Sequence, residues 1–262
     1  MMPRARRRLE LAMPWLVIAG LIILWQAVVQ LFGIRQFILP APSAIWDAFV
    51  EYRAPILDNA LFTLANTLIG FGLGIAFGVL LGIVIGSSRL AYSGLYPLLI
   101  GINSVPKAAV VPILVLWLGI GQPPAIATAF MLSFFPIAVN VATGLATVEP
   151  ELEDVLRSLG ATRLDILRKV GLPRTMPYFF ASLKVSITLA FVGAVLSETI
   201  ASNDGIGYLM LQSASQFRVP LMFAGLMVIA AMGIATYVVF AVLEGRVTSW
   251  ATRRQDTPFG GG

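Results

Sequence analysis

The 262-residue chain contains no cysteine and no histidine, and only 12% of its residues are charged. Without cysteine it can form neither a disulfide nor a thiolate nucleophile. Without histidine it lacks the imidazole general base and the commonest metal ligand, which excludes H-E-x-x-H metalloproteases and Ser–His hydrolases. A soluble domain averages about 25% charged residues, so the low charge also argues against a soluble enzyme.

A nucleotide-binding P-loop is missing as well. That motif ends in Gly-Lys followed by Ser or Thr, because the lysine must reach the phosphates. The three lysines follow Pro106, Arg168 and Leu183, and none follows glycine. Ser104 and Lys107 leave Ser–Lys catalysis open as an alternative, but no further motif supports it. We therefore interpret the chain as a protein without a catalytic site of its own.

Hydrophobic residues make up 58% of the chain, and its mean hydropathy is +0.88. A helix needs about 20 mostly apolar residues to cross a bilayer. Six stretches meet this requirement, so the sequence predicts an all-α membrane protein with six transmembrane helices. The arginines before the first stretch resemble those of a secretory signal, but the apolar run is longer than a signal core and no cleavage site follows it. The predicted spans are residues 13–32, 61–86, part of 95–118, 124–147, 177–200 and 220–243.

Lys and Arg in the loops are distributed unevenly between the two sides of the membrane. Thirteen lie on the side of the N-terminus and three on the opposite side, with the lysines inside spans omitted. Because short cytoplasmic loops are enriched in Lys and Arg, both termini and the 149–176 loop are predicted to be cytoplasmic. The alternation also disfavours a nucleic-acid surface. The predicted organisation is a basic cytoplasmic N-terminus at 1–12, a single transmembrane domain at 13–243 and a cytoplasmic tail at 244–262.

Five glycines recur at every fourth position of the second span. Spaced in this way they lie along one face of a helix, where a neighbouring backbone can approach closely. Because glycine lowers helix propensity, the repeat needs a packing reason. Packing within the subunit, a subunit interface and a sliding surface for a moving helix all remain open. The glycines are Gly70, Gly74, Gly78, Gly82 and Gly86.

Two charged residues inside the spans are candidates for a functional site, such as a pathway or gate across the membrane. Lys107 lies in the third span between Pro106 and Pro112, which obstruct regular helix bonding. Non-helical backbone at membrane depth persists only against protein or water, and a lysine there is a functional hypothesis. The alternative is a lysine that extends to the inner interface, as expected for Lys184. Glu198, near the outer end of the fifth span, is either a functional acid or a structural cap.

The 149–176 loop is the longest and most charged connection between spans, and its pattern predicts two short amphipathic helices. Pro150 suits the first turn of the first helix. Gly160 is predicted to end that helix at a positive φ, which only glycine adopts cheaply. Between Pro150 and Gly160, four apolar residues at helical spacing form a stripe that needs a partner to bury it. They are Leu152, Val155, Leu156 and Leu159.

The second short helix is predicted at 163–170. Thr162, with Asp165 three residues later, resembles a capping box in which Asp replaces the usual Glu. Gly171 and Pro173 are predicted to end the helix.

A third short helix is predicted after the first span, at 44–52. Ser43 is a natural N-cap residue directly before it. Its apolar stripe, opposite two acids, is typical of a helix that lies in the outer membrane–water interface.

The segment DVLRSLGATRLDILRKVGLP, residues 154–173, resembles the cytoplasmic loop motif of bacterial ABC importer permeases. That motif reads E-A-A, three residues, Gly, nine residues, Ile, any residue and Leu-Pro. The Gly and the Leu-Pro pair are in register here, whereas Asp, Val-Leu and Val replace Glu, Ala-Ala and Ile. The resemblance makes eight residues candidates for coupling to an ATPase: Asp154, Val155, Leu156, Gly160, Ala161, Val170, Leu172 and Pro173.

Three further blocks, ILPAPSAIW, SVPKAAVVPILVLWLGIG and SETIASNDGIGYLM, look like the sulfonate, taurine and nitrate branch of this family. Permeases for bicarbonate, thiamine precursors and aromatic acids are similar too. The resemblance covers about residues 39–250 and implies a type I importer permease, multi-pass in the bacterial plasma (inner) membrane.

The same resemblance implies the partners. A homodimer of permease subunits would bind two ATP-binding subunits through the loop helices and receive solute from an extracytoplasmic binding protein. A sulfonate, taurine, nitrate or similar small solute would cross by alternating access. ATP and Mg would lie on the partner ATPase, with no cofactor on this chain and no nucleic acid involved. An ATP-independent channel or a secondary transporter is the alternative.

Overall fold

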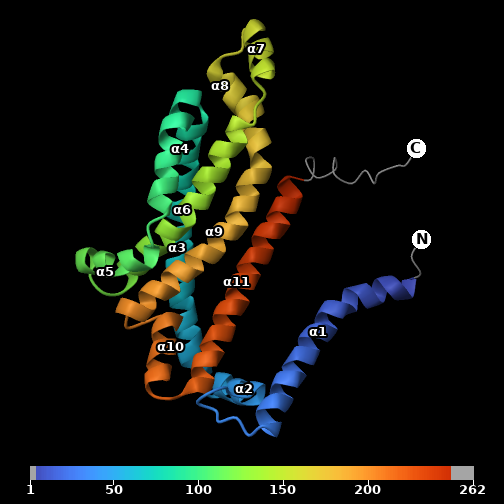
Figure 1. The fold of residues 1–262 in the computed structure, drawn as a ribbon, viewed down its shortest axis with the longest axis vertical. Helices are drawn as coiled ribbons and strands as arrows, with labels where there is room; N and C mark the ends of the chain where they lie inside the picture. The colour runs from blue at the N-terminus through green and yellow to red at the C-terminus, as the bar shows by residue number, and fades with distance from the viewer. Residues whose placement is uncertain (1–3, 249–262) are drawn as a thin grey trace.

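The computed structural model describes the backbone of residues 4–248, and the side chains of the same range except 4–11 and 150. The distal part of the predicted cytoplasmic tail, 249–262, therefore lies outside the described residues, as do residues 1–3. Within the described part the secondary structure is helical, without strands, which confirms the predicted all-α class (Figure 1).

Five of the described helices are long and apolar enough to cross a membrane. A pair of shorter helices brings the number to six if it is counted as one span, in agreement with the six predicted stretches. The five long helices are α1 (Arg4–Leu31), α3 (Arg53–Gly86), α6 (Gln122–Ala146), α9 (Leu172–Ala201) and α11 (Val219–Val247).

The predicted third span is instead two helices, α4 (Arg89–Asn103) and α5 (Lys107–Leu118), bent by 84° at a short break. The break falls directly before Pro106, which has no N–H to continue the hydrogen bonding of α4. Pro112, which was expected to disturb the span as well, lies inside α5. The proline signal was therefore correct at one position and wrong at the other.

Three long helices, α3, α6 and α9, pack together as the centre of the bundle. Their contact surface holds a cluster of buried apolar side chains that includes Phe71, Ile137 and Ile187. On the α9 side, a Cβ atom placed on Gly193 would lie 2.7 Å from the carbonyl oxygen of Thr128 on α6. At this point α9 and α6 approach each other at backbone distance.

The short helix after the first span is α2 (Pro42–Glu51), and Ser43 does not cap it. Ala41 occupies the N-cap position and Pro42 is the first helical residue, where its fixed φ suits the helix. Ser43 instead exchanges two 3.1 Å hydrogen bonds with the side chain of Gln26 on α1. The predicted cap is thus wrong, and Ser43 connects α2 to α1.

The remaining elements lie at the two ends of the bundle. Figure 1 shows α7 and α8 at one end, and α2 and α10 at the other. In Figure 1, α1 runs toward the end that holds α2, and α11 runs from that end back toward the opposite one. These short helices are α7 (Pro150–Ser158), α8 (Arg163–Ile166) and α10 (Ile206–Ser215).

Candidate functional site

The first candidate site is the corner between α7 and α8. Acidic Glu151 and Glu153 lie in the first turn of α7, where they favour the positive end of its dipole. The helix ends at Gly160, whose φ of +86° confirms the predicted left-handed conformation. The N–H of Ala161 then donates to the carbonyl of Leu156 at 3.0 Å, which closes the helix end in a Schellman-type turn.

A capping box opens α8, as predicted. The N–H of Asp165 donates to the Thr162 hydroxyl at 3.1 Å, and the N–H of Thr162 donates to the Asp165 carboxylate at 3.2 Å. Lys169 pairs with the same carboxylate at 3.0 Å. The hydrogen bonds from Thr162, reinforced by Lys169, lower the pKa of the Asp165 carboxyl to about 2. This solvent-facing corner is therefore held in a defined shape by local charge and hydrogen bonding.

The second loop helix does not end at Gly171 and Pro173. A single π-helical turn, Leu167–Gly171, connects α8 directly to α9. In this turn the N–H of Leu172 donates to the carbonyl of Leu167, five residues back. The wider π turn lets the chain pass a proline, which cannot donate. The result is one helical stretch of 39 residues, Arg163–Ala201, that extends from the corner through the bundle.

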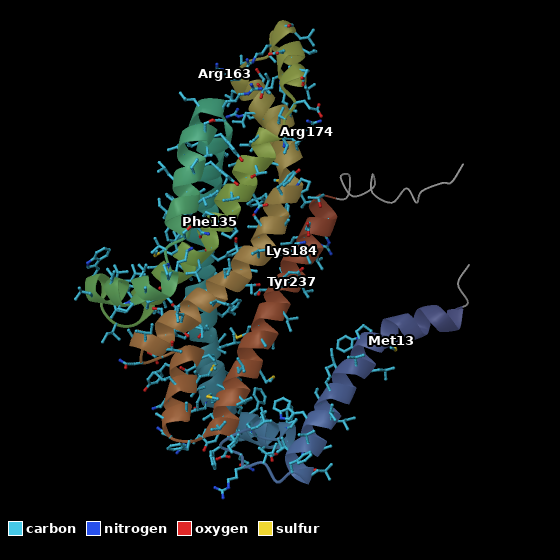
Figure 2. All side chains as sticks on the ribbon, in the orientation of Figure 1. Met13, Phe135, Arg163, Arg174, Lys184 and Tyr237 are labelled. Carbon is cyan, nitrogen blue, oxygen red and sulfur yellow. The ribbon has the colours of Figure 1, made fainter. Side chains whose placement is uncertain are left out.

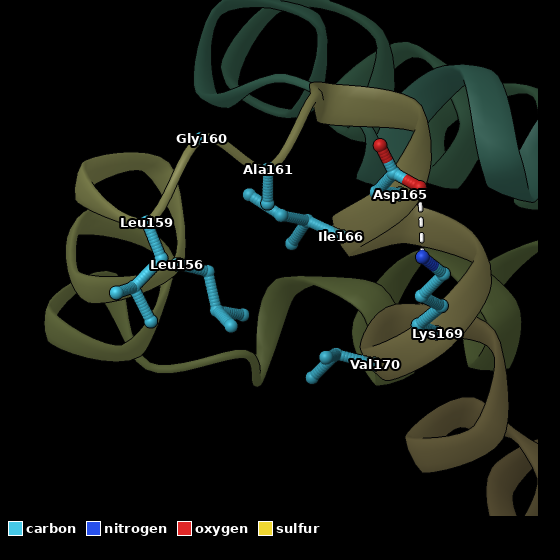
Figure 3. A pocket seen from close by; sticks show the side chains of 8 residues that line it. All are labelled: Leu156, Leu159, Gly160, Ala161, Asp165, Ile166, Lys169 and Val170. Carbon is cyan, nitrogen blue, oxygen red and sulfur yellow. Dashed lines mark ion pairs between the residues drawn. The ribbon is translucent and has the colours of Figure 1, made fainter.

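A cavity of about 350 Å³, lined by apolar and charged side chains, opens between α7 and the start of this long stretch (Figure 3). Leu159, which lines it, is 79% exposed, and Val155, elsewhere on α7, is 56% exposed. Of the predicted coupling residues, four line the cavity, Asp154 and Val155 lie on α7, and Leu172 and Pro173 begin α9. Figure 2 shows Arg163 and Arg174 at this same end of the bundle. The lining residues are Leu156, Leu159, Gly160, Ala161, Asp165, Ile166, Lys169 and Val170.

Glu198 lies at the opposite end of α9 and is only 1% exposed. Its carboxylate accepts hydrogen bonds from Thr63 at 2.7 Å and Asn66 at 3.3 Å on α3, and from the N–H of Gly207 at 3.2 Å. Sequence reasoning missed these partners. The available signal was polar Asn59, Thr63 and Asn66, which share one face of an otherwise apolar helix.

Lys107 is the first residue of α5 and is half-buried. Its ammonium donates to the main-chain and side-chain oxygens of Asn103, at the end of α4, and lies 5.9 Å from the ring centre of Phe135. The 15 residues of α4 place it about 22 Å along the helix from Arg89. The role of Lys107, in a pathway or at the inner interface, stays a prediction.

Lys184 has a partner of opposite charge inside the bundle. Its ammonium pairs with the Glu244 carboxylate of α11 at 2.5 Å, and both side chains are less than a quarter exposed, at 22% and 23%. The ion pair connects α9 to α11 and joins Lys184 to the first residue of the predicted cytoplasmic tail, so the extension of Lys184 to the inner interface stays a prediction.

The five glycines of α3 face α6 of the same chain. A Cβ atom placed on Gly70, Gly78, Gly82 or Gly86 would lie within 3.0 Å of an α6 atom, and one on Gly74 would overlap Ser133. In contrast, a Cβ on Gly72 would meet nothing within 4 Å. The close approach follows the four-residue spacing, and the packing is within one subunit.

The five long apolar helices and the bent pair α4–α5 define a multi-pass membrane protein. Residues 74–249 match the family described as "Binding-protein-dependent transport system inner membrane component", and the chain belongs to that family. It is thus a permease component of an ABC importer of the bacterial inner membrane, which works with ATPase and substrate-binding partners. The resemblance noted in the sequence is confirmed, and family membership disfavours an ATP-independent channel.

Individual relatives agree with this assignment. The formylaminopyrimidine transport permease ThiX of Halalkalibacterium halodurans is 29% identical over 97% of this chain and 100% of its own. The putative aliphatic sulfonates transport permease SsuC of Bacillus subtilis is 29% identical over 88% of this chain and 85% of its own. A solved chain of the MetNI methionine ABC transporter shares the fold, with a TM-score of 0.66, 19% identity, and coverage of 76% and 98%.

Proposed function

We propose that two copies of this chain form the transmembrane pathway of an importer with two ATP-hydrolysing subunits and an extracytoplasmic binding protein. ATP and Mg bind to the ATPase subunits, and this chain binds no cofactor. The cargo is a small solute such as a sulfonate, taurine or nitrate. Relatives named for formylaminopyrimidine and for aliphatic sulfonates are equally similar, at 29% identity, so the binding protein is expected to select the cargo.

The observation that supports this function best is the corner between α7 and α8. The exposed apolar side chain of Leu159 lies at the rim of a cavity at a charged end of the molecule, and exposed apolar surface at such a place favours a protein interaction site. The corner continues into α9 without a break, so an ATPase subunit that displaces it also displaces a helix at the centre of the bundle. Alternating access then follows from two arrangements of the helices, each favoured by different ligands.

Replacement of Leu159 by Asp tests this docking role. Leu159 is 79% exposed and lines the cavity. A carboxylate at this position would be buried by the docked ATPase subunit without a partner, which costs about 2 kcal/mol or more. We expect L159D to lose copurification of the ATPase subunit while the permease still inserts. The adjacent exposed residue Ser158 does not line the cavity, so S158D adds the same charge as a control. Equal ATPase recovery with both variants would show that the corner is not the docking site.

Orientation can be tested with a single thiol, because the chain has no cysteine. A cysteine at Ser158 is expected to react with a membrane-impermeant maleimide only after the inner face is made accessible, since most loop Lys and Arg share its side. A cysteine at Asp47 of α2 should react from outside. Labelling of S158C in intact cells would reverse the proposed topology.

A further inference from the structure

The first turn of α10 has no capping side chain of its own. Its N-cap residue is Gly205, with a φ of +99°, and no side-chain cap is present. The first N–H groups of any helix lack partners within the helix and must find acceptors elsewhere. Here three successive N–H groups find them on two other helices. The bonds are Gly205 to Asn59 at 2.7 Å, Ile206 to Thr63 at 2.8 Å and Gly207 to Glu198 at 3.2 Å.

Thr63 connects these bonds to one another. Its hydroxyl accepts from Ile206 and donates to the Glu198 carboxylate at 2.7 Å. Asn66 donates to the other carboxylate oxygen. The carboxyl group of Glu198 therefore lies at the start of α10 and, with Thr63 and Asn59, takes the place of the cap that this helix lacks.

The side chain of Glu198 is enclosed by α3, α9 and α10 and is only 1% exposed. A Cβ atom on Gly207 would lie 2.8 Å from the Cβ of Glu198 and 2.5 Å from the carbonyl oxygen of Val195, so α10 begins in direct contact with α9. The turn before α6 joins the same region, because the N–H of Gly121 donates to the carbonyl of Ala201 at 3.0 Å. Glu198 therefore lies where α3, α9 and α10 meet, at the end of the bundle opposite the coupling corner.

We propose that Glu198 is a positioning residue: with Thr63, it fastens the start of α10 to α3 and α9, so that displacement of α9 reaches the far end of the bundle. The 30 residues of α9 extend about 45 Å from the coupling corner to this joint. Through that helix, a movement imposed at α7 and α8 would carry α10 with it. This role replaces the alternative in which Glu198 contacts the solute.

Two threonines of α3 offer a matched test. Thr63 and Thr67 are both fully buried, but the Thr67 hydroxyl has no hydrogen-bond partner among the described residues. Threonine to valine keeps the shape of the side chain and removes only the hydroxyl. Ser213 of α10 is 3% exposed, so S213C supplies a buried thiol that reacts with maleimide only when α10 separates from its neighbours. The purified complex of permease and ATPase subunits serves for every variant.

We expect T63V to accelerate S213C labelling by about tenfold to a hundredfold, because it removes one buried hydrogen bond to the Glu198 carboxyl group and one cap. T67V should change the rate by less than about twofold, and T63S should restore protection. E198Q, which keeps one acceptor oxygen, should lie between T63V and the parent. Equal labelling in T63V and T67V would overturn the proposal.

Transport kinetics separate positioning from solute contact. T63V and E198Q are expected to lower kcat while KM for the loaded binding protein stays within about twofold, because the joint acts after the solute has arrived. A raised KM with S213C still protected would show that Glu198 meets the solute, and the proposal would be wrong. The labelling test needs no cargo, so its result does not depend on the proposed transport function.

Discussion

Gly78→Leu is expected to lower the thermal midpoint of the purified complex by roughly 6–12 °C and to abolish transport. A Cβ at this position would lie 2.7 Å from the carbonyl oxygen of Phe134 and 2.9 Å from the Cβ of Ile137. Neither atom can move unless α6 moves away from α3. Overpacking of this kind costs about 3 kcal/mol, and each kcal/mol corresponds to about 2–4 °C for a chain of this size.

Gly72→Leu provides the control for Gly78→Leu. It removes a glycine from the same helix, but a Cβ there would meet no atom within 4 Å, so only the favourable change in helix propensity remains. The midpoint of Gly72→Leu should equal or exceed that of the parent. Both variants should be compared by complex yield, thermal melting and transport. If Gly72→Leu is as harmful as Gly78→Leu, the four-residue spacing has no packing role.

Local sequence patterns predicted where the helices lie in the chain more reliably than which helices pack against each other. The glycine spacing indicated a close helix contact, yet nothing in it identified α6 as the partner. That choice depends on residues such as Ala129 and Val141, which the chain brings opposite the glycines only after folding. Gly193 on α9 makes a similar approach to α6 without any repeat, and it was therefore missed.

The corrections at prolines have a common physical origin. Pro106 breaks a helix, whereas Pro112 and Pro173 are accommodated inside helical stretches. A proline removes one hydrogen bond, and packing or a π turn can compensate for that loss. Whether compensation exists depends on tertiary contacts. The 84° angle between α4 and α5 was equally beyond prediction, because a proline signals a break without its direction.

Glu198 shows where sequence reasoning about a site ends. An acid in an apolar span was correctly identified as unusual, but its two possible roles could not be separated. Thr63, on which the proposed positioning role depends, is 135 positions away in the chain. No local pattern connects residues at that separation, so the cage around the carboxylate became visible only in three dimensions.

Gly160→Val is expected to reduce coupled transport about tenfold or more while the spans fold as before. The φ of +86° at this residue places it in the left-handed region, which costs an L-residue about 1–2 kcal/mol and a β-branched one more. Relief of that strain requires the turn from Leu156 to Ala161 to open, which would redirect α7 and reshape the cavity. ATP hydrolysis should then continue without stimulation by the loaded binding protein.

Gly160→Asn and Gly160→Ala distinguish backbone strain from bulk. A Cβ on Gly160 would meet no atom within 4 Å, so the space around it admits either side chain. Asparagine tolerates the left-handed conformation better than alanine or valine, because its short polar side chain can bond to the local backbone. Transport should therefore decline in the order Gly, Asn, Ala, Val, with thermal stability of the bundle unchanged throughout. Equal activity of the Asn and Val variants would show that the conformation of Gly160 does not determine coupling, and that the corner transmits motion by another contact.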